Sequence, residues 1–190
     1  MALDPEPTRI RRFEEQVLAH LDDLYRVALR LTGKGPEAED LVQETCLRAF
    51  RSLDQLAHPT AAKTWVFAIL RSVYLRQAER ERFGHALVGL EDLDASLLVP
   101  SEAVRDLYET YSPWREALKQ EVRGAILKLP LVYREALILA HIAGFTYKEI
   151  ARILDVPLGT VMSRLFRARR MLRACLRESL ASRGRPEPTR

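Results

Sequence analysis

The most constraining feature of the sequence is a pair of closely spaced helical patterns in residues 145–177, which read FTYKEIARILDVPLGTVMSRLFRARRMLRACLR. Thr146 followed three residues later by Glu149 is a capping box, which predicts that a helix begins here. Asp155 falls where the chain must turn sharply, because Asp tolerates the left-handed conformation better than most residues. Pro157 suits the first position of a second helix. Together these signals predict a helix-turn-helix.

The second of these helices has two different faces. Six arginines and no acidic residue lie between positions 164 and 177. A solvated basic face is one interpretation, but an unbalanced row of guanidinium groups repels itself unless an anion lies against it. The row therefore favours contact with nucleic acid, with this helix in the major groove of DNA. The apolar residues expected to pack inward are Val161, Leu165, Ala168, Leu172 and Leu176. The residues expected on the opposite stripe are Thr160, Ser163, Arg164 and Arg167.

Charge is distributed unevenly along the 190 residues, although the net charge is only +4. Residues 115–190 carry 16 basic and 7 acidic side chains, residues 1–84 carry 13 of each, and residues 85–114 carry one arginine and six acids. This asymmetry predicts a basic DNA-binding module attached to a part with a different partner. We expect domains at residues 1–84 and 115–180, an acidic flexible linker at 85–114 and a disordered tail at 181–190.

The periodic segments have the helical period, so the predicted fold class is all-α. A first helix is expected to carry one stripe from Phe13 through Val17 to Leu31, ending at Gly33. Further helices are expected from Pro36 to about residue 53, over about 63–83, over 114–129 and over 131–143.

The sequence favours no enzyme. It has no Ser/His/Asp set, metal-ligand cluster, paired-carboxylate spacing or glycine-rich phosphate loop, so we expect no catalytic residue, no metal and no cofactor. Cys46 and Cys175 lie far apart and are expected to be buried or partly buried thiols. The charged N-terminus is unlike a signal peptide, and the longest apolar run is too short to span a bilayer. A cytoplasmic protein is expected, with no membrane insertion.

Two segments resemble a known family. AEDLVQETCLRAFRSL (residues 38–53), followed by TWVFAILRSVYL (residues 64–75), resembles the polymerase-binding and promoter-melting domain of bacterial sigma-70-type factors. FTYKEIARILDVPLGTVMSRLFRARRMLR resembles their promoter-reading C-terminal domain. With two such domains and a short linker, the chain is similar to the extracytoplasmic-function (ECF) group of sigma factors. Many regulators share the helix-turn-helix pattern, whereas the two segments in this order and spacing are highly specific.

The resemblance implies that one stripe of residues 38–53 binds the clamp helices of the largest polymerase subunits. By composition alone an ordinary solvated face is favoured, but Leu47 among polar neighbours is typical of the centre of a small interface. The stripe consists of Asp40, Gln43, Glu44, Leu47, Arg48 and Arg51.

The resemblance also implies that the loop 54–63 and the helix after it capture unpaired bases of the minus-ten promoter element. Such capture needs basic groups along the backbone and flat or polar groups for the bases. Trp65 is the type of side chain that stacks on bases, but its spacing with Ile69 and Val73 favours a core position. The implied residues are His58, Thr60, Lys63, Arg71, Ser72, Tyr74, Arg76 and Arg80.

For the minus-thirty-five element, the resemblance implies DNA contacts at those residues of the second helix that match the family's contact positions. One of them, Phe166, could instead pack in the core. Two positions depart from the family pattern, since Ser72 stands where Asn is common and Met162 where Lys or Arg is frequent. Met contacts a thymine methyl but donates nothing to guanine. The implied contacts are Thr160, Ser163, Arg164, Phe166, Arg167 and Arg169.

The partners implied by the resemblance are core RNA polymerase, through its clamp helices and flap, and promoter DNA in double- and single-stranded form. An anti-sigma protein is also expected by resemblance. The rival hypothesis is a conventional helix-turn-helix activator or repressor with an N-terminal dimerisation domain. The outward stripe of residues 38–53 and the basic helix after it discriminate between the two, because a dimerising regulator needs neither.

Overall fold

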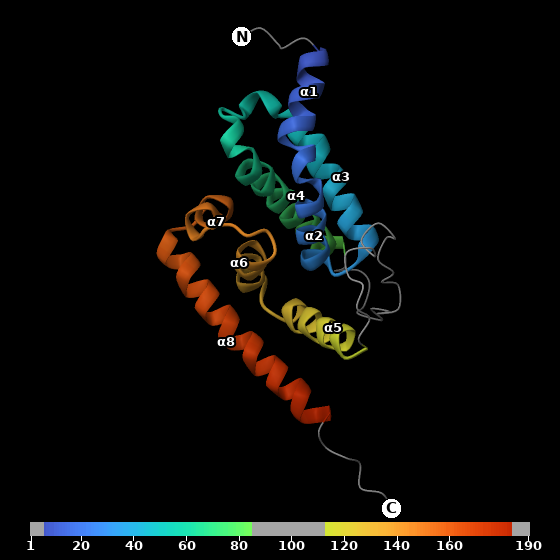
Figure 1. Cartoon of the computed structure of the whole chain (residues 1–190), viewed down its shortest axis with the longest axis vertical. Helices are drawn as coiled ribbons and strands as arrows, with labels where there is room; N and C mark the ends of the chain where they lie inside the picture. The colour runs from blue at the N-terminus through green and yellow to red at the C-terminus, as the bar shows by residue number, and fades with distance from the viewer. Residues whose placement is uncertain (1–5, 85–112, 184–190) are drawn as a thin grey trace, which may run out of the picture.

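The computed structural model describes residues 6–84 and 113–183, which form helices and short connections with no strand among them (Figure 1). The all-α fold class is confirmed. We call residues 6–84 the N-terminal half and residues 113–183 the C-terminal half. Most of the expected linker, residues 85–112, and the end of the expected tail, residues 184–190, lie outside the described residues.

The N-terminal half contains α1 (Glu6–Gln16), α2 (Leu21–Thr32), α3 (Gly35–Arg51) and α4 (Ala62–Gly84). The prediction of one continuous helix through Phe13, Val17 and Leu31 is wrong, because a short 3₁₀ turn at Leu18–His20 separates α1 from α2. Before the break, α1 packs against the end of α3, where the Phe13 and Phe50 rings meet edge to face, and Arg12 donates to the backbone oxygen of Leu56 at 2.9 Å. Val17 at the break is fully buried.

The C-terminal half contains α5 (Pro113–Leu127), α6 (Leu131–His141), α7 (Tyr147–Leu154) and the long α8 (Leu158–Arg183). The predicted capping box is confirmed: the Thr146 amide donates to a Glu149 carboxylate oxygen at 2.8 Å, and the Glu149 amide donates to the Thr146 hydroxyl. Asp155 ends α7 in the left-handed conformation, with φ of 50°. The two helices α7 and α8 therefore form the predicted helix-turn-helix.

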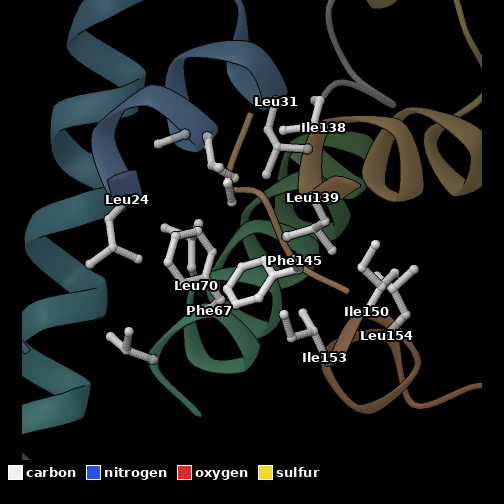
Figure 2. Packing of buried hydrophobic residues seen from close by; sticks show 14 of the residues in the cluster. Leu24, Leu31, Phe67, Leu70, Ile138, Leu139, Phe145, Ile150, Ile153 and Leu154 are labelled. Atoms are coloured by element: carbon white, nitrogen blue, oxygen red, sulfur yellow. The ribbon is translucent and has the colours of Figure 1, made fainter. Parts of the chain in front are cut away.

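One apolar cluster extends through both halves, an arrangement that the sequence did not predict. Figure 2 shows Phe67 of α4 beside Phe145, which precedes α7, with side chains of α6 and α7 around them. The two rings meet edge to face, with centroids 4.9 Å apart. The remaining cavity at this junction has a volume of about 10 Å³, roughly what one water molecule needs. The halves are therefore packed against each other closely.

Polar contacts from the C-terminal half cover the end of α2. Arg134 of α6 donates to the backbone oxygen of Leu31 at 3.1 Å, and Arg123 of α5 donates to that of Gly33 at 2.7 Å. The last carbonyl groups of a helix have no partner within the helix, and they attract cations. Gly33 has φ of 83°, and a Cβ there would lie 3.1 Å from a methyl group of Leu127. Glycine at this position thus ends α2 and leaves room for α5.

Candidate nucleic-acid and protein interfaces

The outward face of α8 begins with small hydroxyl residues at its first turns. Ser163 is exposed, and its hydroxyl donates to the backbone oxygen of Thr160 at 3.0 Å. Thr160 is half-buried, whereas Arg167 is exposed and its guanidinium lies 3.5 Å from the Tyr133 hydroxyl. Because this long contact is the one that Arg167 makes within the described part of the chain, its side chain is available to a ligand at the surface.

The other two predicted arginines of α8 are less exposed. Arg169 is half-buried, with its guanidinium 3.4 Å from the Tyr147 hydroxyl and 3.4 Å from Nε2 of His141. Arg164 is also half-buried, and its Nη1 is shielded from solvent without a hydrogen-bond partner among residues 6–84 and 113–183. A shielded guanidinium nitrogen without an acceptor costs free energy.

Apolar side chains share this face with the arginines. Phe166 is 69% exposed and Met162 is 52% exposed. The alternative that Phe166 packs in the core is therefore wrong. Both line an open groove of about 430 Å³ together with Tyr147, Arg170 and Arg173. This mixture of cations and exposed apolar groups suits a DNA groove, where apolar atoms meet thymine methyl groups and cations meet phosphates.

The stripe predicted on α3 lies on one surface. Asp40, Gln43 and Arg51 are exposed. Leu47 is 52% exposed among them, while Glu44 and Arg48 form an ion pair one helical turn apart. A large apolar side chain exposed within a charged stripe is typical of a protein interface.

A surface groove of about 600 Å³ lies between α3 and α4. Arg48 and Arg51 line it from α3, and Ser72 and Arg76 line it from α4, where Arg76 donates to the Ser72 hydroxyl at 3.3 Å. Trp65 forms part of the wall. It is half-buried and packs against the core, so it combines the predicted core position with a face on the groove.

The residues predicted for the minus-ten element lie in several places. His58, Thr60 and Arg80 are exposed. Tyr74 is half-buried and donates to the backbone oxygen of Leu31 at 3.2 Å, on the side of α2. Lys63 and Arg71 contact the C-terminal half. The structure thus brings together Ser72 and Arg76 in the groove but does not gather all eight residues on one surface.

Lys63 and Arg71 form polar contacts between the halves. Lys63 Nζ lies 2.9 Å from a carboxylate oxygen of Asp23, 3.2 Å from the backbone oxygen of Ala143 and 5.2 Å from the centre of the Phe145 ring. Arg71 Nε donates to a carboxylate oxygen of Glu135 at 3.1 Å.

Glu135 is the main residue that the sequence analysis missed. It is 4% exposed, and burial raises the pKa of its carboxyl above the ordinary value, while Arg71, Arg164 and Arg134 oppose this shift. The one available signal was an acid, directly after Arg134, within the mostly apolar residues 131–143. Its partner lies 64 residues away, so the pattern alone did not identify the pair.

Both cysteines, Cys46 and Cys175, are free and half-buried thiols, as predicted. Within residues 6–84 and 113–183, no helix combines the length and the apolar character needed to cross a membrane. The helix-turn-helix and the cationic outward face of α8 together are typical of a DNA-binding protein.

Comparison with known proteins gives the family. The model of sigma-70 region 2 matches residues 17–83, and that of sigma-70 region 4 matches residues 119–172. The ECF RNA polymerase sigma factor EcfG of Rhodopseudomonas palustris is 34% identical over 162 residues, which cover 85% of this chain and 83% of EcfG. The chain belongs to the ECF group of RNA polymerase sigma factors, the proteins that direct RNA polymerase to promoters.

Further relatives are similar over most of the chain. The ECF sigma factor SigE of Mycolicibacterium smegmatis is 37% identical over 85% of this chain, but the match spans only 60% of SigE. Among solved structures, the sigma factor RpoE in complex with the anti-sigma factor NepR from Bartonella quintana has a TM-score of 0.68 and 30% identity. This match covers 87% of this chain and 96% of the RpoE chain. CnrH in complex with the cytosolic domain of CnrY has a TM-score of 0.61 and 25% identity. This match covers 89% of this chain and 90% of that chain.

Proposed function

We propose that this chain is a promoter-specificity subunit that binds core RNA polymerase and reads two promoter elements. The main support for this proposal is that the models of sigma-70 region 2 and sigma-70 region 4 both match this one chain, in that order. A conventional helix-turn-helix regulator needs only the second of these units. We assign residues 1–84 to polymerase binding and promoter melting, residues 85–114 to a linker and residues 115–180 to recognition of the minus-thirty-five element.

In this proposal α8 enters the major groove at the minus-thirty-five element. The exposed Arg167 and Ser163 provide hydrogen-bond donors, and Phe166 and Met162 provide apolar contact to thymine methyl groups. Some of the arginines on α8 neutralise phosphates and so position the helix without specifying sequence. Base readout then depends on the first turns of the helix, and affinity depends on the arginine row.

The α3 stripe is proposed to bind core polymerase, with Leu47 as its apolar centre. The neighbouring groove carries Arg48, Arg51 and Arg76 beside Trp65, which combines cations with an aromatic face. Such a surface suits single-stranded DNA, whose phosphates need cations and whose bases stack on aromatic rings. We propose that melted minus-ten DNA contacts the loop that contains His58 and then runs along the side of α4 that lines this groove.

An anti-sigma protein is proposed as a further partner. The solved structures of RpoE and CnrH that resemble this chain are both complexes, with the anti-sigma factor NepR and with the cytosolic domain of CnrY. The similarity covers 87% and 89% of this chain, which supports a partner of the same kind. The proposed role involves no covalent chemistry by the chain itself.

Run-off transcription with purified core polymerase on a pool of promoters tests the proposal. We expect transcripts that depend on this chain and start downstream of two enriched motifs. Silence under conditions where a control sigma factor works, combined with sequence-specific DNA binding by this chain alone, would refute the proposal in favour of a conventional regulator.

A further inference from the structure

Two arginines of α1 hold the segment that follows α3. Arg12 donates to the backbone oxygen of Leu53 at 3.4 Å and to that of Leu56 at 2.9 Å. Arg9 donates to the backbone oxygen of Phe50 at 2.9 Å, and its guanidinium lies 5.1 Å from the centre of the Phe50 ring. The acceptors lie 41 and 44 residues away from their donors in the sequence. These contacts therefore join α1 to the end of α3 and to the chain beyond it.

The contact of Arg12 does more than cap a helix. The last carbonyl groups of a helix lack partners within it, so the contact of Arg9 with Phe50 is a cap for α3. The backbone oxygen of Leu56 is different, because it lies beyond both α3 and the 3₁₀ turn at Leu53–Gln55. One guanidinium nitrogen of Arg12 donates to the first residue of this turn and to the residue after it. It thereby fixes the backbone where the chain leaves the turn.

An exposed loop begins directly after this fixed point. Residues 57–61 are all exposed, and we call them the exposed loop. Buried residues stand on both sides of it, Leu56 with 3% exposure and Ala62 with 2%. The exposed loop thus presents His58 and Thr60 to solvent from an anchored base. A loop that is ordered before it binds loses less conformational entropy on binding.

We propose that Arg12, assisted by Arg9, is a positioning residue for the exposed loop when it captures unpaired minus-ten bases. This inference rests on the proposed function, because it deepens the role given there to the loop with His58. Arg12 contacts no DNA in this proposal and acts through the backbone of Leu56. Both arginines precede residues 17–83, which the model of sigma-70 region 2 matches. The selectivity of the minus-ten contact therefore depends on a helix that begins outside the matched residues.

Two substitutions remove these contacts, and a third is a matched control. Arg12→Gln removes the donor to the base of the exposed loop. Arg9→Gln removes the donor to the end of α3 and the ion pair with Asp54 in the 3₁₀ turn. Arg11→Gln is the control, because Arg11 is exposed on the same helix and pairs with Glu15 of that helix. Each substitution removes one positive charge. Circular dichroism establishes that each variant is folded, and Arg9→Gln tests the proposal if Arg12→Gln does not fold.

Hydrogen exchange of the free full-length chain, followed by mass spectrometry, measures the order of the loop. The amides of Leu56 and Ala61 donate to backbone oxygens of Leu53 and His58, so their exchange reports local opening. Loss of a hydrogen bond from a charged donor changes a local equilibrium by about tenfold. We expect these amides to exchange about tenfold faster in Arg12→Gln than in wild type, and faster by a smaller factor in Arg9→Gln. Arg11→Gln should exchange as wild type does.

Run-off transcription with core polymerase measures the effect on base selection. The templates are a pool of promoters with a randomised minus-ten element and one fixed minus-thirty-five motif. A preferred base is selected about five- to a hundredfold over the others in a specific site. We expect Arg12→Gln and Arg9→Gln to lose most of this preference at one or two minus-ten positions. Affinity for core polymerase and dependence on the minus-thirty-five motif should stay unchanged, and Arg11→Gln should match wild type throughout.

The outcomes separate the positioning role from other roles and from the proposed function. If wild type selects minus-ten bases and the folded variants keep either the exchange rate or the base preference of wild type, the positioning role is overturned. A loss of equal size on all minus-ten sequences, with a salt dependence lower by about one phosphate, overturns it in favour of a direct phosphate contact. If exchange rises as expected but no protein, wild type included, supports transcription where a control sigma factor works, the positioning of the loop is supported and the proposed function is overturned.

Discussion

The packing of the two halves can be tested through the aromatic pair Phe67 and Phe145. The side chains are 1% and 5% exposed, and their rings meet at an interplanar angle of 78°. Replacing Phe by Ala in a core costs about 3–5 kcal/mol. A loss of that size could unfold a chain whose total stability is about 5–15 kcal/mol. We therefore choose Phe67→Leu, Phe145→Leu and the double variant, because leucine keeps most of the apolar volume.

The structure sets the expected size of the effect. Each single replacement should cost about 1–1.5 kcal/mol, as a hydrophobic exchange of similar volume does. An edge-to-face pair contributes about 0.5–1.5 kcal/mol beyond its buried area. The double variant should therefore lose less stability than the sum of the single losses, by about 0.5–1.5 kcal/mol. This difference exists only if α4 packs against the segment before α7.

Urea unfolding of the full-length chain, followed by circular dichroism at 25 °C, measures the three losses. Because one apolar cluster extends through both halves, we expect a single transition with an unchanged denaturant slope. A second pair provides the control. Phe13 and Phe50 meet edge to face at 5.2 Å entirely within the N-terminal half, so their coupling does not depend on the junction. A coupling below about 0.3 kcal/mol for Phe67 and Phe145, beside a clear coupling in the control pair, would refute the packing of the halves.

Three further predictions concern the proposed interfaces and the helix-turn-helix. Gln43→Ala and Arg51→Ala should each weaken binding to core polymerase by about 1 kcal/mol and leave binding to minus-thirty-five DNA unchanged; equal core affinity in both variants would contradict the interface. Arg167→Ala should weaken DNA binding by about 1–3 kcal/mol and relax one position of the site in a selection assay, whereas an equal loss on all sequences would indicate a phosphate contact. Hydrogen bonds from the Thr146 hydroxyl and amide lower the pKa of Glu149, so the stability that this group contributes is present above its ordinary pKa and is lost as pH falls through the lowered value. Thr146→Ala should accordingly cost about 1 kcal/mol near neutral pH and less at pH about 3 by urea unfolding, and an equal cost at both pH values would exclude the carboxylate contribution.

Local signals allowed the helix-turn-helix to be predicted from the sequence. The capping box of Thr146 and the left-handed Asp155 involve atoms within a few residues of each other, so the pattern contains the whole interaction. The break between α1 and α2 accompanies contacts with residues far away in the sequence. Arg12 donates to the backbone oxygen of Leu56, 44 residues away, and the helical periodicity of residues 13–31 carries no information about that contact. Local chemistry was predictable, whereas changes of helix direction that depend on distant carbonyl groups were not.

In the candidate surfaces, too, local features were predictable from the sequence and features that depend on distant residues were not. Spacing on α3 correctly placed Leu47 on the exposed side, because one helix determines which of its own residues share a face. Spacing also predicted the apolar side of Trp65 but not its groove, which α3 and α4 form together. For Arg71, the sequence supplied a basic residue on a basic helix, while its carboxylate partner belongs to the other half. Which cations are free and which are paired depends on tertiary contacts that helical periodicity does not encode.

The contacts at the junction also differ in what their separation costs. Water replaces the arginine donors to the carbonyl groups of Leu31 and Gly33 at little net cost, because both partners are hydrated after separation. Phe67 and Phe145 have no such replacement, and each loses roughly 1.5–3 kcal/mol when its side chain is exposed to water. The apolar contacts therefore provide most of the free energy that holds the two halves together, and the arginine–carbonyl hydrogen bonds contribute little to it.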